Sequence, residues 1–110
     1  MHGTSVQKAV KAGIRIAYGT DIGGIEWSEP MAQEFPLLTK FGLTPMAAIR
    51  AATSRAADLL DEKGELGVVA PGAYADMIAV SGDPLNKIEE LGNVKFVMKG
   101  GSVFKNDLTK

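Results

Sequence analysis

The sequence contains no cysteine and a single histidine, His2. The absence of cysteine excludes disulfides, thiolate metal sites and cysteine nucleophiles. It is compatible with a reducing compartment, and we expect a cytoplasmic protein. Because His2 belongs to no metal-ligand pattern, a metal site built from histidines within this chain is excluded as well.

Long apolar runs and an excess of one charge are also missing. No apolar run approaches the ~18 residues that a membrane span needs, and the first residues do not form a signal peptide. The net charge of −1 gives no electrostatic reason to expect nucleic acid or an anionic membrane as a partner. With 110 residues, 45% of them hydrophobic and 23% charged, the chain has the size and composition of one small globular domain.

The first part of the chain reads as an α/β unit. Thr4 or Ser5 can cap a short helix that ends at Gly13. Residues 14–18 follow at once as a short apolar run, which predicts a buried strand. The chain then passes through Gly19 and Thr20 into a glycine-containing loop.

Two more helices are expected before residue 60. The first opens at residues 28–29 and should be kinked or divided by Pro36. Its apolar stripe consists of Met31, Phe35, Leu38 and Phe41. The second begins with Thr44 as the cap and Pro45 in the first helical position, and its pattern runs to about residue 60.

From Asp61 onward the helical period disappears and turn signals separate short strands. Strands are predicted over residues 76–80 and 94–98, followed by a hairpin into Val103 and Phe104. Asp76 at a strand start and Asp83 in a turn are expected to bond the local backbone. The chain thus divides into residues 1–60 and 61–110.

Asp21 is the best candidate for a catalytic residue. It stands at the carboxyl end of the predicted strand, where active sites of α/β folds collect. From the residues alone, a turn-forming aspartate before Gly23 and Gly24 is an open alternative. The loop residues Gly23, Gly24 and Trp27 either face a substrate or fill an ordinary loop. Arg50 and Arg55 on the second helix are expected to be solvated or paired with acids.

Four motifs in order resemble the C-terminal third of metal-dependent amidohydrolases, in the imidazolonepropionase and Xaa-Pro dipeptidase-like branch. The resemblance covers nearly the whole chain, from about Val6 to Phe104. The motifs are Gly19-Thr20-Asp21, Gly42-Leu43-Thr44-Pro45 with the helix up to Thr53, Gly67-x-x-x-Pro71-Gly72-Ala73-x-Ala75-Asp76, and Asp83-Pro84.

The resemblance implies an α/β fold: the C-terminal part of a (β/α)8 TIM barrel, followed by strands of a small β-sandwich domain. Residues 14–18 would be the eighth barrel strand, residues 29–60 the helices behind it, and residues 61–110 the C-terminal sandwich strands. The implied activity is hydrolysis of C–N bonds in a small amide, cyclic amide or dipeptide. Water activated by a divalent metal, zinc in this resemblance, would be the nucleophile.

The resemblance gives Asp21 two roles, as a metal contact and as the general base that takes a proton from the metal-bound water. Gly23, Gly24 and Trp27 would lie on the substrate side. The family's other metal ligands, a His-x-His pair, a carboxylated lysine or glutamate, and two further histidines, have no counterpart here.

Because those ligands are missing, we expect these 110 residues alone to bind no metal and to be inactive. We also expect exposed strand edges to favour self-association. The other interpretation is a self-standing, non-enzymatic α/β module that binds or assembles.

Overall fold

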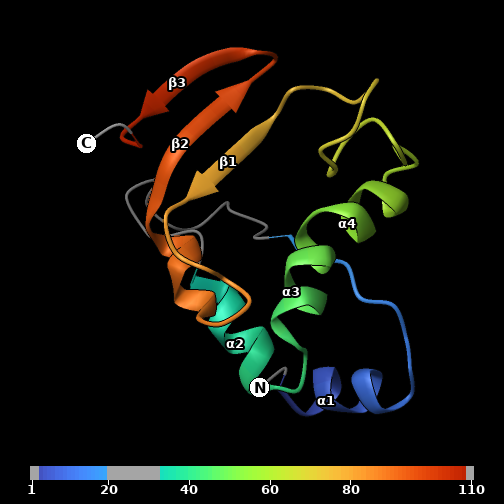
Figure 1. The fold of residues 1–110 in the computed structure, drawn as a ribbon. Coiled ribbons are helices and arrows are strands. Elements are labelled where there is room, and N and C mark those ends of the chain that lie inside the picture. The colour runs from blue at the N-terminus through green and yellow to red at the C-terminus, as the bar shows by residue number, and fades with distance from the viewer. Residues whose placement is uncertain (1–2, 20–32, 109–110) are drawn as a thin grey trace, which may run out of the picture.

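The computed structural model describes residues 3–19 and 33–108. The described helices form one half of the molecule, and a three-stranded sheet forms the other (Figure 1). No helix in these two ranges is long and apolar enough to cross a membrane. The elements are α1 (Gly3–Lys11), α2 (Glu34–Lys40), α3 (Pro45–Ala52), α4 (Ser54–Leu59), β1 (Met77–Val80), η2 (Ile88–Gly92), β2 (Val94–Lys99) and β3 (Ser102–Asn106).

The first helix ends where the sequence predicts. The Gly13 N–H donates to the Val10 carbonyl (3.1 Å), and the Ile14 N–H donates to the Ala9 carbonyl (3.1 Å). These two bonds form a Schellman motif, which satisfies carbonyl groups that the last helical turn leaves unpaired. The chain therefore leaves α1 and becomes extended within one residue.

Residues 14–18, predicted as a buried strand, are neither buried nor paired as a strand within the described residues. This run has no strand partner within the described residues, and 61% of Ile14 is exposed. A strand needs a neighbouring strand to pair its N–H and C=O groups. Here the Tyr18 N–H donates to the Ala51 carbonyl of α3 instead (2.8 Å). The run is thus held by a helix rather than by a sheet.

Pro36 lies in the first turn of α2, which directly follows Gln33 in a 3₁₀ turn. The predicted start at residues 28–29 lies outside the described residues, and α2 begins at Glu34. Pro36 therefore falls in the first described turn, where an N–H group has no intrahelical acceptor and its loss costs little.

The helix predicted to run from Thr44 to residue 60 begins as expected but is broken in the middle. The Thr44 hydroxyl caps α3 by accepting from the Ala47 N–H (3.1 Å). At Thr53 the backbone leaves helical geometry (φ −121°, ψ −92°), so that α3 and α4 are separate helices. The backbone of Gly67 packs against Thr53 and Ser54 at this break. Gly67, which is distant in sequence, therefore packs at the point where the helix breaks, although the local sequence favours a continuous helix.

The predicted strands and hairpin are confirmed. All neighbours in the sheet are antiparallel, with β2 between β1 and β3. Met98 of β2 pairs with Met77 on one side and with Val103 on the other. Phe104 has no partner in the β3 register, because Val97 pairs with Lys105 and Met98 with Val103. This extra residue is a β-bulge on the edge strand.

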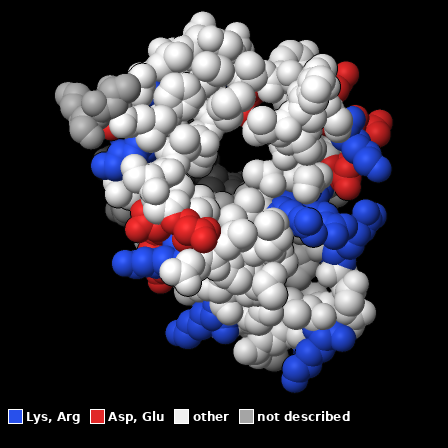
Figure 2. Space-filling model, viewed as in Figure 1, with Lys and Arg blue, Asp and Glu red and all other residues white. Residues whose placement is uncertain are grey.

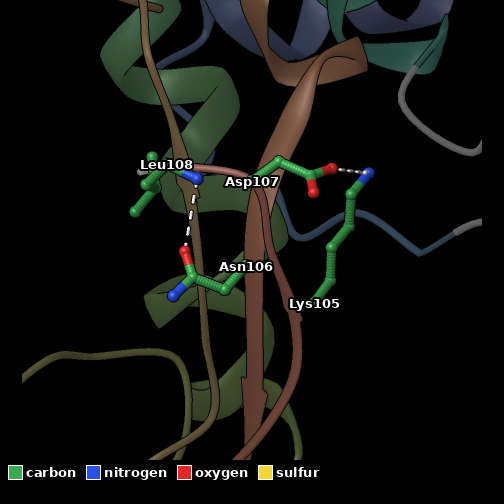
Figure 3. A network of polar contacts seen from close by, with 4 residues as sticks. All are labelled: Lys105, Asn106, Asp107 and Leu108. Atoms are coloured by element: carbon green, nitrogen blue, oxygen red, sulfur yellow. Dashed lines mark hydrogen bonds and ion pairs between the residues drawn. The ribbon is translucent and has the colours of Figure 1, made fainter. Parts of the chain in front are cut away.

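Polar contacts lie at the end of β3, the last strand of the sheet (Figure 3). The Asn106 side-chain oxygen accepts from the Leu108 N–H (3.2 Å), and the Lys105 ammonium lies 3.8 Å from the Asp107 carboxylate. The Asp107 N–H donates to the Lys95 carbonyl of β2 (2.7 Å). An Asx turn of this kind ends strand pairing, because the side chain supplies a local acceptor.

The hydrophobic core lies in the helical half and is small. Leu38, Leu43, Ala48 and Ala51 form its buried cluster. No large side chain within the described ranges is fully buried. By contrast, Val69, Leu59 and Phe104 are 81%, 77% and 71% exposed. The helices therefore bury only part of the apolar surface that the sequence carries.

Candidate active site

The residues that lead to Asp21 are fixed by packing on the helices. Ile16 and Tyr18 lie on the same side of the extended run, because successive side chains alternate between two sides. Both pack against the buried cluster of Leu38, Leu43, Ala48 and Ala51. The bond from the Tyr18 N–H to the Ala51 carbonyl holds the backbone as well.

Tyr18 joins the two described ends of the segment that contains Asp21. Its ring meets the Phe35 ring edge-on, with centroids 5.5 Å apart and planes at 73°. This geometry suits the aromatic quadrupoles. Burial raises the pKa of the Tyr18 phenol, and the negative charge of Glu34 raises it further. The phenol is therefore neutral at physiological pH, and Tyr18 acts here as an anchor.

All the predicted site residues lie outside the described residues. These residues are Asp21, predicted to be the general base and a metal contact, and Gly23, Gly24 and Trp27, predicted to contact the substrate. His2 lies outside them too. Their roles stay predictions, but the chain enters this segment after Gly19 and leaves it before Gln33, beside the Tyr18–Phe35 contact.

Two aspartates of the β-rich half bond the backbone with their carboxylates. The Asp76 carboxylate accepts from the Gly100 N–H of the β2–β3 hairpin (2.8 Å). The Asp83 carboxylate accepts from the Leu85 N–H two residues on (3.0 Å). The interpretation of Asp83 as a local backbone partner is confirmed. Asp76 also bonds the backbone, but its partner is 24 residues away, so the expectation of a local partner is wrong for Asp76.

The described residues do not by themselves fit a metal ion. They contain no group of three or more His, Cys, Asp or Glu side chains that could hold one. Zinc sites use three or four protein ligands. Asp21, the single ligand that the sequence nominates, would need partners from elsewhere.

Two hollows stand out on the described surface, and the sequence predicts neither. An apolar hollow of about 650 Å³ lies between α3 and β1, and Figure 2 shows a hollow among uncharged residues near its centre. A smaller one, of about 350 Å³, is lined in part by Arg15, Arg50 and Arg55. The ion pair in this region joins Arg15 to Asp58 (3.9 Å). The sequence does not predict this ion pair, because Arg15 and Asp58 come together only through tertiary packing.

The chain belongs to the amidohydrolase family, whose sequence profile matches residues 2–104. It is 39% identical to ochratoxinase of Aspergillus niger over an alignment 111 positions long, which covers 94% of this chain and 22% of that enzyme. This membership confirms the resemblance seen in the sequence motifs.

Solved structures agree with the family and the fold. A crystal structure of a Xaa-Pro dipeptidase with methionine bound in its active site superposes with a TM-score of 0.86 and 36% identity, over 94% of this chain and 25% of that one. The crystal structure of A. niger ochratoxinase gives a TM-score of 0.80 and 36% identity, over 96% and 25%. The chain therefore has the fold of part of an amidohydrolase and spans about a quarter of the length of these relatives.

Proposed function

We propose that these residues are the C-terminal part of an amidohydrolase that hydrolyses C–N bonds in small amides or dipeptides. The observation that carries the proposal is the match to ochratoxinase over 94% of the chain at 39% identity. The likeness to a Xaa-Pro dipeptidase supports the same bond type. We place the enzyme in the cytoplasm.

Asp21 is the residue of this chain that does chemistry in the proposed enzyme. Aspartate is ionised at neutral pH, so it can accept a proton from the attacking water. It can then return that proton to the departing nitrogen. Gly23, Gly24 and Trp27 would border the substrate beside it. The anchored run of Ile16 and Tyr18 favours this role, because it holds the backbone that leads to Asp21.

A divalent metal, zinc in the family resemblance, belongs to the proposal for the longer protein. When bound, such a metal lowers the pKa of its water from 15.7 to about 7. Asp21 supplies one ligand, and the others must come from outside these 110 residues. We therefore propose that the 110-residue chain alone is inactive and binds no metal.

The two parts of the chain differ in structure, and we propose that they also differ in role. Residues 1–60 hold the described α-helices, and we propose that they form the C-terminal segment of the barrel. Residues 61–110 hold the described strands, and we propose that they are C-terminal strands of a composite β-sandwich. The helical half would then carry the catalytic aspartate and the strands would support it.

A chimera tests the proposal. This chain replaces the matching 22% of ochratoxinase, and hydrolysis of ochratoxinase's own substrate is followed. We expect a folded, active chimera that loses activity with EDTA and regains it with Zn²⁺, because the metal activates the water. The unaltered ochratoxinase is the control. A chimera that folds, as judged by circular dichroism, but does not hydrolyse the substrate contradicts the proposal.

The second candidate is a self-standing, non-enzymatic module that binds or assembles, whereas self-association of the isolated chain is also expected of an enzyme part whose strands lack their partners. The chain exposes 7,891 Å², whereas a folded monomer of 11.6 kDa exposes roughly 5,800 Å². Both β1 and β3 are edge strands of the sheet, and exposed edges pair with other chains.

We therefore expect the isolated chain to associate at concentrations on the order of 100 μM. Light scattering checks this expectation, and a compact monomer would contradict it. Stoichiometric zinc retained by the isolated chain would argue against the enzyme-part proposal, since Asp21 alone cannot hold it.

A further inference from the structure

The hollow of about 350 Å³ beside the start of α3 combines an apolar wall with three arginines. Arg15 comes from the extended run after α1, Arg50 from α3 and Arg55 from α4. The apolar wall is formed by Val10, Ile14, Ile16, Leu43, Met46 and Ala47. Volumes of about 300–1,000 Å³ with an apolar lining and a few convergent polar groups are typical of small-ligand sites.

The charge around this hollow is not balanced within the described residues. A neighbouring hollow of about 320 Å³ shares Arg15 and Arg55 and adds Asp58, which is the only acid among the described residues that line either hollow. The Asp58 carboxylate lies 3.9 Å from Arg15, beyond hydrogen-bond distance. Arg50 and Arg55 form no ion pair with a described residue. Three arginines and one aspartate thus line the two hollows, in a chain whose net charge is −1.

Figure 2 shows Lys and Arg side chains over the part of the molecule that holds α3 and α4, with Asp and Glu side chains directly beside them. A guanidinium group presents a planar fork of N–H donors that matches a carboxylate with two parallel bonds. The apolar wall beside it suits a hydrocarbon group. We propose that this hollow is a binding site for a carboxylate joined to a short apolar chain.

A matched pair of ligands tests the site on the chain as it exists. Hexanoate and hexanamide have nearly the same shape, but only hexanoate is an anion. In a titration of the ¹⁵N-labelled chain, kept below the concentration at which we expect it to associate, we expect hexanoate to shift the backbone amide signals of Gly42, Leu43 and Ala47. We expect hexanamide to bind at least about tenfold more weakly, since charged hydrogen bonds are the stronger ones. Equal affinity for the two ligands would overturn the proposal.

Substitutions then assign the charge to particular residues. We expect Arg50→Gln and Arg55→Gln each to weaken hexanoate binding about tenfold. Lys40→Gln is the matched control, because Lys40 is an exposed cation on α2 that lines neither hollow. Unchanged affinity in both arginine variants would refute the site.

If a variant fails to fold, the comparison of hexanoate with hexanamide on the unaltered chain still decides the question. The binding does not depend on hydrolysis, so a negative result leaves the proposed function of Asp21 untouched.

Discussion

Asp21→Asn in the ochratoxinase chimera is expected to lower kcat by about 10²–10⁴-fold, because a positioned general base contributes a factor of this size. Asparagine has nearly the same volume but is neutral and cannot accept the proton. KM should change less, since the substitution removes an interaction made mainly in the transition state. Steady-state kinetics of the chimera and its variant measure both quantities.

The asparagine variant also separates the two interpretations of Asp21 that the sequence leaves open. Asparagine forms Asx turns and tolerates unusual backbone angles as well as aspartate does. A purely turn-forming residue would therefore survive the substitution with activity intact. A kcat within about threefold of the unaltered chimera would exclude a general base at this position, whose removal costs at least 10²-fold.

Asp61→Asn provides the matched control for this experiment. Asp61 is exposed and has a positive φ of 60°. Asparagine adopts this left-handed conformation readily. The same chemical change is thus made at an aspartate with no proposed role. We expect the Asp61→Asn chimera to keep its kcat.

The sequence predicts well the features that depend on neighbouring residues. The end of α1 at Gly13, the Thr44 cap of α3 and the Asp83 turn each need only residues within about five positions. The strands β1, β2 and β3 also follow the predicted runs, because alternation and turn residues mark them locally. The family resemblance rests on short motifs of the same kind, and the sequence profile confirms it.

The features that the sequence predicts poorly depend on contacts between distant segments. The break at Thr53 lies where Gly67 packs against it, 14 residues further along the chain. The run of residues 14–18 has the composition of a strand, but a strand also needs a partner. Likewise, nothing local pairs Arg15 with Asp58 or brings three arginines to one hollow. A local sequence pattern carries no information about such contacts between distant segments.

In the candidate site, too, local features are predictable from the sequence and contacts between distant segments are not. A carboxylate after an apolar run is visible in the sequence, and so is its place in the family motif. What completes an active site around it is a set of residues brought together by the fold. These residues cannot be recovered from 110 positions that contain one histidine and no cysteine. The anchoring of Tyr18 by Ala51 and Phe35 is the part that the structure adds.

Gly67→Ala is expected to destabilise the chain by about 2–5 kcal/mol, for two separate reasons. The positive φ of 74° at Gly67 is unfavourable for an L-residue by about 1–2 kcal/mol. The new methyl group would also collide with the Thr53 carbonyl group, and overpacking of this kind costs about 1–3 kcal/mol. Bonds from the Leu66 N–H to the Glu62 carbonyl (3.2 Å) and from the Tyr74 N–H to the Glu65 carbonyl (2.9 Å) limit how far the loop can move away.

Gly72→Ala isolates the backbone effect from the collision. Gly72 also has a positive φ of 88°, but a Cβ there would meet no atom within 4 Å. We expect this variant to lose only the about 1–2 kcal/mol of the left-handed conformation. Urea unfolding of both variants and of the unaltered chain gives the two differences in the free energy of unfolding. Equal losses in the free energy of unfolding would mean that the loop moves away from Thr53 at no cost. The contact between Gly67 and the break in the helix would then contribute nothing to stability.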